Sequence, residues 1–397
     1  MIRRMRIGFV VGEFPLLSHT FVISQIEGFM RRGYDISVIC DRIGSDRRID
    51  ATAEPMKTML ENTHRWWRLS SRLRSAVGRL PPKLQDKVST AADMLWTEEL
   101  NRCDLLLAHF GNNGLRLARA KKQKRLAPPI VTIFHGNDVG IPAHEGTLQR
   151  YMPLFQHGTC QLTVNEVFRR QLIEVGAPEH QVAVHRMGID CDDIPYHPRN
   201  MDEGPLRLIS VCRLVEKKGI AFALRAVAAL QAAEPQIEWR YSVIGDGPLL
   251  DELRALAGEL GIEERVRFYG ALPHGDVKEH LARSHIFLLP SVTATDGDVE
   301  GVPVALMEAM AAGLITVSTY HSGIPELIEN HKTGFLAPEK DVEALATHLI
   351  WIAENRDASH AVTAAARRHI EAEFNNDVLN DRLATMITSL LAEKQVA

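Results

Sequence analysis

The feature that most constrains the fold of this 397-residue chain is the regular alternation of short β-type and longer helix-type segments in its second half. Alternation at this spacing predicts βαβ units, and therefore a parallel sheet with helices on both faces and right-handed crossovers. The predicted segments are 206–212, 220–231, 239–245, 249–261, 266–270, 276–284, 285–290, 304–313 and 315–319. From residue 341 onward we expect helices only.

A less regular alternation occupies the first half, so a second α/β domain is predicted there. The chain is too long for a single hydrophobic core, which favours two domains. The segment 195–205 has three prolines and no apolar periodicity, as expected of a linker. The predicted organisation is an N-terminal Rossmann-like domain, a linker, a C-terminal Rossmann-like domain and a last helix that packs back toward the N-terminal domain, with bounds 1–195, 196–205, 206–372 and 373–397.

Neither membrane insertion nor secretion is indicated. No apolar run approaches the ~20 residues that a membrane span needs. The apolar stretch near the N-terminus runs directly into Gly12 and Glu13, so it predicts a first β-strand rather than a signal peptide. The five cysteines are scattered without a CxxC pair, which disfavours a disulfide framework or a structural zinc site. A cytoplasmic location is expected.

The charge is distributed unevenly. Residues 1–200 hold 28 Lys+Arg and 21 Asp+Glu, whereas the remainder holds 18 and 29. A basic first half suggests that it faces an anionic partner, such as nucleic acid, a membrane surface or a phosphorylated acceptor. The tract 57–87 combines eight basic residues with Trp66 and Trp67, which suits peripheral contact with an anionic membrane. The alternative is an insertion that packs its tryptophans on the core. Nucleic acid is disfavoured because no recognised binding module accompanies the charge.

Two loops of the second half follow predicted strands, where open α/β sheets bind their ligands. In SVCRLVEKKG (210–219), Arg213 and Lys218 flank a turn and could hold a diphosphate, although they could equally be surface cations. In VIGDGP (243–248), Gly245 could let the backbone approach a ligand, but a tight turn before the next helix is favoured.

A third loop, within LLPSVTATDGDVEGVPVALMEAMAAG (288–313), holds two carboxylates. Glu300 lies in the loop, and Glu308 lies on a helix that is predicted to start near Pro303. The exposed N–H groups of that helix start would form a phosphate site, with one carboxylate at the reacting centre and the other on a ribose. The alternative is a loop acid and a surface acid. Glu308 is surrounded in sequence by apolar residues, which weakens that alternative.

In their order and spacing, these motifs resemble the retaining glycosyltransferases of family 4, which have the two-domain GT-B fold. The resemblance is greatest to exopolysaccharide enzymes of the colanic-acid and amylovoran type. It rests on the Glu-x7-Glu pattern and on FPLLSHTFVISQI (14–26), FHGNDV (134–139), DGDVEGVPVALMEAMAAG (296–313) and HSGIPELIE (321–329). It implies transfer of a hexose from a UDP- or GDP-linked sugar to a glycan or polyprenyl-diphosphate-linked acceptor, without a cofactor or metal.

The resemblance also implies roles for individual residues. Arg213 and Lys218 would bind the donor pyrophosphate, and Glu308 the ribose. Glu300 would lie at the donor sugar and its leaving group. Gly12, in a loop after the first strand, would contact the donor phosphate. His135 would be catalytic and would lie near O6 of the sugar. The departing phosphate would be held by the backbone of Gly301, Val302, Pro303 and Val304. The acceptor would bind the basic N-terminal domain, with transfer in the cleft between the domains.

Three alternatives remain open in the sequence. Asp296 and Asp298 form the Asp-x-Asp pattern with which GT-A enzymes bind a metal, but fixed cations can replace that metal, so loop polarity is favoured. A GT-B-fold sugar-nucleotide epimerase would need no acceptor and no basic face. A non-catalytic nucleotide-sugar-binding protein would not need Glu300, Arg213 and Lys218 together.

Overall fold

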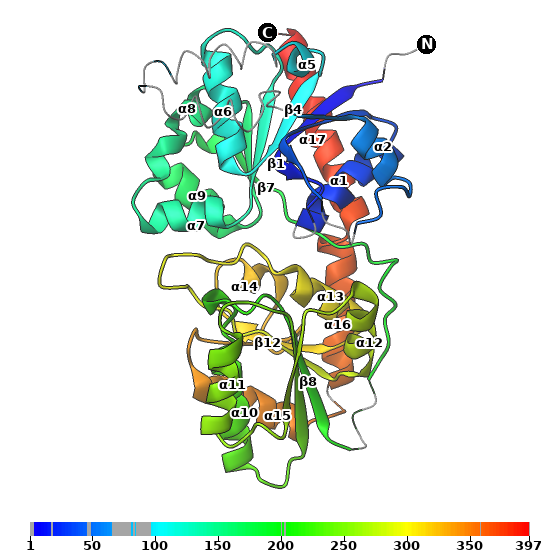
Figure 1. Cartoon of the computed structure of the whole chain (residues 1–397), viewed down its shortest axis with the longest axis vertical. Helices are drawn as coiled ribbons and strands as arrows, with labels where there is room; N and C mark the ends of the chain where they lie inside the picture. The colour runs from blue at the N-terminus through cyan, green and yellow to red at the C-terminus, as the bar shows by residue number, and fades with distance from the viewer. Residues whose placement is uncertain are drawn as a thin grey trace. The chain divides into compact units, whose positions relative to one another are not determined.

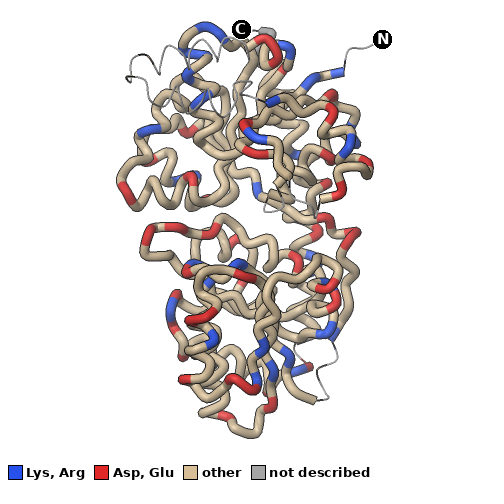
Figure 2. The backbone as a smooth tube through the Cα atoms, in the orientation of Figure 1, with Lys and Arg blue, Asp and Glu red and all other residues tan. Residues whose placement is uncertain are grey.

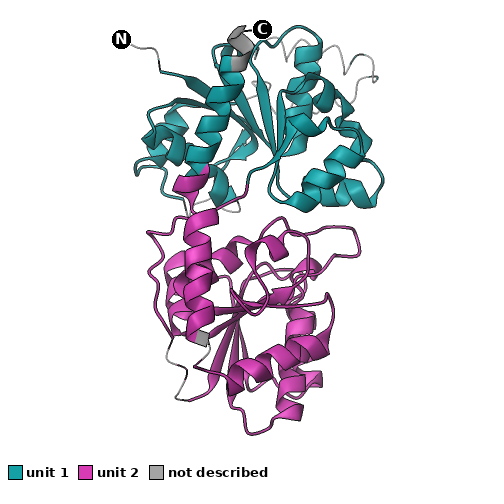
Figure 3. Cartoon of the chain, turned by 180° about the vertical axis from the view of Figure 1, so that it is seen from behind, with its two compact units in different colours: residues 1–185, 380–397 teal, residues 186–379 magenta. Residues whose placement is uncertain are grey.

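The computed structural model describes residues 4–16, 19–45, 49–65, 81, 84, 97–199, 201, 204–357 and 359–396. The chain forms two compact units, of which the first contains 1–185 and 380–397 and the second contains 186–379 (Figure 3). The segment 196–205, predicted as a linker, therefore lies inside the second unit. The end of the predicted C-terminal helix belongs to the first unit, because 380–397 is assigned there.

The first unit is built on a seven-stranded parallel sheet with the order β3-β2-β1-β4-β5-β6-β7 (Figure 1). Its described elements are β1 (Arg6–Phe14), α1 (Thr20–Arg31), β2 (Asp35–Ile43), α2 (Met56–Glu61), β3 (Thr63–Arg65), α5 (Thr97–Asn101), β4 (Leu105–His109), α6 (Gly111–Lys122), β5 (Ile130–Phe134), α7 (Asn137–His144), η2 (Leu148–Tyr151), α8 (Met152–His157), β6 (Cys160–Thr163), α9 (Glu166–Glu174), η3 (Glu179–Gln181) and β7 (Val182–Val184). The prediction of a second α/β domain in the first half is confirmed.

The second unit is built on a six-stranded parallel sheet with the order β10-β9-β8-β11-β12-β13 (Figure 1). Its elements are β8 (Leu206–Val211), η4 (Glu216–Lys218), α10 (Ile220–Ala233), β9 (Trp239–Ile244), α11 (Leu250–Glu259), β10 (Val266–Gly270), α12 (His274–Arg283), β11 (Ile286–Leu288), α13 (Val304–Ala312), β12 (Ile315–Thr319), α14 (Ile324–Leu327), β13 (Phe335–Ala337), α15 (Val342–Glu354), α16 (Ser359–Glu373) and the start of α17 (Asn376–Val396). Each predicted segment of this half matches an element, which confirms the doubly wound parallel sheet.

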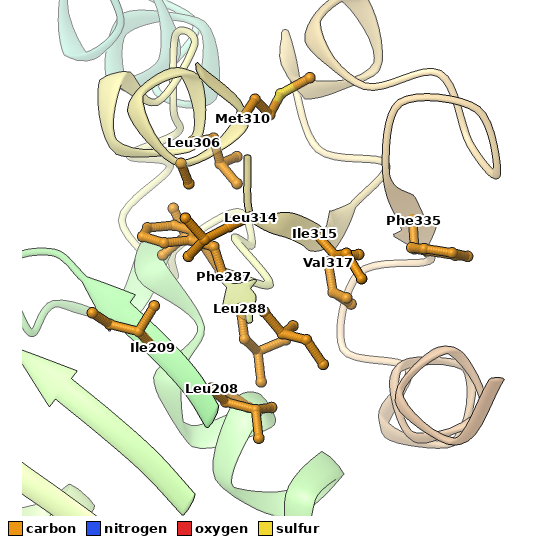
Figure 4. Packing of buried hydrophobic residues seen from close by; sticks show 14 of the residues in the cluster. Leu208, Ile209, Phe287, Leu288, Leu306, Met310, Leu314, Ile315, Val317 and Phe335 are labelled. Carbon is orange, nitrogen blue, oxygen red and sulfur yellow. The ribbon is translucent and has the colours of Figure 1, made fainter. Parts of the chain in front are cut away.

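The central strands of the two sheets are buried on both faces. All five residues of β4, β5 and β12 are buried. This is the pattern of parallel strands in α/β proteins, which lack a solvated face. In the second unit, Phe287 and Leu306 lie in one apolar cluster with residues from β8, β12 and β13 (Figure 4). This packing fixes α13 against the sheet and thereby positions the loop that precedes it.

The strand order reverses at one point in each sheet. In the second unit, β8 lies between β9 and β11, so the connections after β8 and β11 leave neighbouring strand ends. In the first unit, β1 lies between β2 and β4. Open α/β sheets bind ligands at such switch points, outside the carboxyl ends of the strands. The two most informative loops of the sequence, 212–219 and 289–303, therefore follow adjacent strands.

Basic and acidic residues are interspersed along the described parts of the two units (Figure 2). No helix among the described residues is both long and apolar enough to cross a bilayer. Most of the basic tract 57–87, including Trp66 and Trp67, lies outside the described residues. Its described members Lys57 and Arg65 are exposed.

Candidate active site

The centre of the candidate site is an ion pair between the loops after β8 and β11. Nζ of Lys218 lies 2.6 Å from Oε1 of Glu300. Glu300 is only 7% exposed. Burial alone would raise the pKa of this carboxyl, but the nearby ammonium groups of Lys218 and Lys217 outweigh it and hold the pKa below its ordinary value. Glu300 is therefore a buried carboxylate that stays ionised.

A second cation from the same turn, Lys217, contacts the loop that carries Glu300. Its Nζ lies 2.9 Å from Oδ1 of Asp298 and donates to the Val299 carbonyl at 3.2 Å. Oδ1 of Asp296 accepts the Asp298 N–H at 2.9 Å. Both aspartates therefore stabilise the loop itself. Among the described residues, no three His, Cys, Asp or Glu side chains are arranged to hold a metal ion.

Arg213 differs from the two lysines in that it points into solvent. It is exposed, and its guanidinium makes no ion pair with any described residue. It lies two residues after the end of β8 and precedes η4, so it lies at the same strand end as Lys218. An exposed guanidinium on the same strand end as the Lys218–Glu300 pair is a suitable anchor for an anionic ligand.

Two glycines make the close approach of these loops possible. Gly219 has φ +66°, and a Cβ there would lie 1.8 Å from the Pro290 carbonyl oxygen. Gly245 has φ +135°, and a Cβ there would lie 1.8 Å from the Cys212 carbonyl oxygen. Each glycine thus lets one loop lie directly on the backbone of its neighbour. For Gly245 this is the tight-turn role favoured from the sequence, and its predicted donor contact stays a prediction.

The helix α13 supplies the second carboxylate and, at its start, backbone N–H groups that have no acceptor inside the helix. It begins at Val304 with Pro303 as N-cap, so the first N–H groups have no acceptor within the helix. The preceding Val302 is buried, and Gly301 is half-buried. The predicted segment 301–304 therefore presents its backbone at a helix start, the arrangement that binds phosphate in other proteins.

Glu308 lies about one turn further along α13, at the wall of a cavity of about 270 Å³. The lining also includes Asp193, Ile194, Pro195, His197, Arg199, His274, Val277, Lys278, Glu279, Leu281, Ala282 and Ala312. Burial raises the pKa of Glu308 to about 7, and the ammonium of Lys278 offsets part of this rise. The two carboxylates thus differ, because Glu300 stays ionised whereas Glu308 titrates near neutrality.

In the first unit, His135 follows β5 and lies in a buried cluster of aromatic rings. Its Nε2 is 3.1 Å from Nδ1 of His109, and its ring centroid is 4.6 Å from that of Phe21. Oδ1 of Asp138 accepts the backbone N–H groups of His135 at 3.0 Å and Gly136 at 2.9 Å, which fixes the turn after β5. Burial and the neighbouring His109 hold the pKa of His135 well below its ordinary value, so the imidazole is neutral.

The predicted position of Gly12 is wrong. The sequence placed it in a loop after the first strand, but β1 continues to Phe14 and pairs with β2 as far as Ile43. Gly12 therefore lies inside the strand, near its carboxyl end. The apolar pattern weakens after Val11 while the backbone pairing continues, so composition alone ended the strand too early. A Cβ at Gly12 would meet nothing within 4 Å, which leaves open space at this position.

The sequence did not single out three residues that support the site. Lys217 precedes Lys218 in the sequence and secures the loop of Glu300. His321 accepts the backbone N–H of Glu300 at its Nε2, over 3.0 Å, and its Nδ1 lies 2.6 Å from Oε1 of Glu339. The motif HSGIPELIE was visible, but only the fold shows that its histidine reaches the β11 loop. Glu339 follows β13, a three-residue strand too short to predict.

Family models and curated relatives match the chain over nearly its whole length. The model described as "Glycosyltransferase Family 4" matches residues 18–193, and "Glycosyl transferases group 1" matches residues 197–369. The colanic acid biosynthesis glycosyltransferase WcaL of Escherichia coli is 34% identical, with 97% of this chain and all of that protein covered. The amylovoran biosynthesis glycosyltransferase AmsK of Erwinia amylovora is 33% identical at the same coverage.

Solved structures show the same two-unit architecture. HepE of Anabaena in complex with UDP superposes with a TM-score of 0.75 at 19% identity, covering 97% of this chain and all of that one. WaaG, a glycosyltransferase involved in lipopolysaccharide biosynthesis, superposes with a TM-score of 0.64 at 17% identity, covering 96% and 99%. These likenesses show that the fold is GT-B, as the sequence predicted.

Proposed function

This chain belongs to the glycosyltransferase family of the group 1 and family 4 models, and from that premise we propose that it transfers a hexose from a nucleotide-diphosphate sugar to a glycan or lipid-linked oligosaccharide in exopolysaccharide biosynthesis. The observation that carries the proposal is the buried, ionised Glu300 paired with Lys218 at the switch point of the second sheet. An epimerase and a non-catalytic binding protein are the alternatives.

The donor would bind to the second unit. Arg213 and Lys218 would hold the two phosphates, and the N–H groups at the start of α13 would receive the phosphate that departs. Glu308 would accept hydrogen bonds from the ribose hydroxyls. HepE, whose fold this chain shares, has been solved with UDP and with UDP-glucose, which supports a nucleotide-sugar donor. The roles of Gly12 and His135 at the donor stay predictions.

The proposed chemistry is a front-face displacement with retention of configuration. The bond between C1 of the sugar and the leaving phosphate oxygen breaks, and the acceptor oxygen bonds to C1 on the same face. The acceptor proton passes to the departing phosphate. Fixed cations and the helix start stabilise the charge on that phosphate, and the Glu300 carboxylate stabilises the positive charge that develops on the sugar. No metal is required in this scheme.

The deciding experiment is nucleoside-diphosphate release from a panel of UDP- and GDP-sugars, with and without lipid-linked acceptors. Transfer predicts release that depends on the acceptor, and a product whose anomeric configuration matches the donor. Conversion of the free sugar nucleotide without any acceptor would indicate an epimerase, and binding without turnover a non-catalytic protein. In the same assay activity should survive EDTA. Loss that manganese restores would return Asp296 and Asp298 to consideration as metal ligands.

Nucleotide affinity should depend on pH through Glu308. Its carboxylate is the better acceptor for ribose hydroxyls, and its raised pKa of about 7 means that it gains a proton as the pH falls through neutrality. With a pKa of about 7, the ionised fraction of Glu308 falls by about tenfold between pH 8 and pH 6, so we expect UDP or GDP affinity to drop by about tenfold, or ~1.4 kcal/mol. Calorimetry at both pH values measures this drop.

The Glu308→Gln variant is the control for the ligand's own titration. The phosphates of the nucleotide titrate identically in both experiments, so only the parent should lose the additional affinity. Equal pH dependence in the parent and the variant would remove Glu308 from the ribose site.

We further propose that the first unit binds the acceptor and contacts anionic membrane peripherally, where a polyprenyl-linked acceptor would be found. This rests on the basic balance of the first 200 residues and on the tract 57–87. Because salt screens such contacts, sedimentation with anionic vesicles should decline as ionic strength rises, and neutral vesicles should bind poorly. Salt-independent sedimentation would contradict the proposal. A cytoplasmic location stays a prediction.

A further inference from the structure

The loop that carries Glu300 is tied at two places to a single carboxylate from another part of the sheet. Oε2 of Glu339 accepts the backbone N–H of Thr293 at 2.9 Å, near the start of the loop. Oε1 of the same carboxylate lies 2.6 Å from Nδ1 of His321, and Nε2 of His321 lies 3.0 Å from the backbone N of Glu300. A chain of hydrogen bonds therefore runs from Glu339 through His321 to the backbone of Glu300.

The partners of His321 determine which of its nitrogens carries the proton. The Glu300 amide can only donate, so Nε2 of His321 must present its lone pair. On the other side of the ring, burial would raise the pKa of Glu339, but hydrogen bonds from Thr293 and His321 outweigh it and hold that pKa below its ordinary value. Glu339 is therefore an ionised acceptor, and Nδ1 must carry the hydrogen. The ring is a neutral Nδ1–H tautomer with both nitrogens occupied.

His321 is placed to orient Glu300 rather than to touch a ligand. It is only 1% exposed, and both of its nitrogens are engaged within the protein. On its other side, Glu300 contacts Lys218, so its backbone and its carboxylate are held from two different segments. A displacement of about 1 Å at a reacting group can cost on the order of a hundredfold in rate.

We propose that His321, held as the Nδ1–H tautomer by Glu339, is a positioning residue that fixes the backbone of Glu300 for the transfer step. The inference rests on the proposed role of Glu300. It goes beyond that role by assigning the orientation of the carboxylate to a histidine that contacts neither donor nor acceptor. A histidine that merely fills the core would make the same apolar contacts but would not depend on which nitrogen is retained.

Two substitutions separate these roles because each keeps one of the ring's hydrogen-bonding positions. In His321→Gln, the side-chain carbonyl can occupy the position of Nε2 and still accept from the Glu300 N–H. In His321→Asn, the amide can occupy the position of Nδ1 and still donate to Glu339, but nothing accepts from Glu300. We expect His321→Gln to keep kcat within about threefold of the parent, and His321→Asn to lower kcat by about thirtyfold to a hundredfold. The donor KM should change by less than about twofold in both.

Controls separate failure of this inference from failure of the proposed function. Glu300→Gln in the same assay tests the function, since an active Glu300→Gln enzyme would remove the group that His321 is proposed to orient. His348→Gln measures the general cost of replacing a half-buried histidine, because His348 contacts only the Leu336 carbonyl among the described hydrogen bonds. It should keep full activity.

A spectroscopic measurement addresses the tautomer without any enzyme assay. Nitrogen-15 NMR of histidine-labelled protein distinguishes a protonated Nδ1 from a protonated Nε2, and the His321 signals are those that either variant lacks. We expect Nε2 of His321 to be unprotonated, so its nitrogen signal should show no coupling to a directly bonded hydrogen. An Nε2–H tautomer, equal kcat in the two His321 variants, or full activity in His321→Asn would each overturn the inference.

Discussion

Glu300→Gln is expected to lower transfer by about a hundredfold to a thousandfold, or ~2.7–4 kcal/mol in the transition state, while UDP or GDP affinity stays within about threefold of the parent. The amide keeps the shape of the side chain, and the backbone N–H can still reach His321. The variant lacks the negative charge of the Glu300 carboxylate, which the nearby ammonium groups keep ionised although it is buried. That charge acts on the transition state more than on the bound donor, so kcat should fall and ground-state affinity should not.

A matched control for this variant is Asp296→Asn, in the same loop. Asp296 is exposed, and its carboxylate accepts the Asp298 N–H, a bond that the amide oxygen can replace. Steady-state kinetics and nucleotide titration of both variants provide the comparison. Transfer by Glu300→Gln within threefold of the parent would remove Glu300 from the catalytic role.

Lys218→Met is expected to affect both ligand binding and folding. Loss of a charge-assisted contact to the diphosphate should weaken UDP by ~1.5–3 kcal/mol, and should weaken the bare nucleoside much less. The folded protein also loses the ammonium that lies 2.6 Å from Glu300, and the two side chains are 15% and 9% exposed. Leaving a buried carboxylate without its partner typically costs ~3–5 kcal/mol, and we expect the lower end because Lys217 remains nearby.

The stability loss in Lys218→Met should depend on pH, with a definite sign. In the parent, the lowered pKa of Glu300 contributes stability above the pKa of the unfolded chain, and that contribution disappears as the pH falls through the folded pKa. Without Lys218 the folded pKa rises, so the variant is penalised at neutral pH and recovers relative to the parent as Glu300 gains a proton. Urea unfolding at pH 7 and near pH 4 measures the difference, which should shrink at the lower pH.

Arg213→Ala is the matched control for this second prediction. Its guanidinium is exposed and forms no ion pair with the described residues, so the variant should lose diphosphate affinity without losing stability. An equal loss of UDP and nucleoside binding in both variants would contradict the phosphate role. A Lys218→Met protein as stable as the parent at pH 7 would show that the ion pair does not hold the loop.

The sequence predicted the second sheet well because its signals are local. Strand and helix alternate at regular spacing there, and the apolar strands have clear ends. The sequence also predicted that the loop of Arg213 and Lys218 lies next to the loop of Glu300. The two loops come after strands that a doubly wound sheet brings together. The sequence did not predict side-chain contacts between segments that lie far apart along the chain. The sequence predicts only a polar loop residue at Asp298, because its partner Lys217 lies 81 residues away along the chain.

Other parts of the prediction depended on backbone pairing, which composition does not report. The strand that holds Gly12 extends to Phe14 because β2 pairs with it beyond the apolar run. The role of His321 depends on Glu339, which follows a strand of three residues. Neither feature has a periodicity that a single sequence could reveal.

The assignment of 380–397 to the first unit bears on how the protein is made. Leu383 and Ile387 of this segment are buried, and Asp381 forms an ion pair with Arg32 at 2.7 Å. A ribosome that has synthesised every strand of the first unit has not yet made the helix that covers part of it. The apolar surface of the first unit that this helix covers therefore stays exposed until the whole second unit has been translated. The two units cannot complete their folding in the order in which they are synthesised.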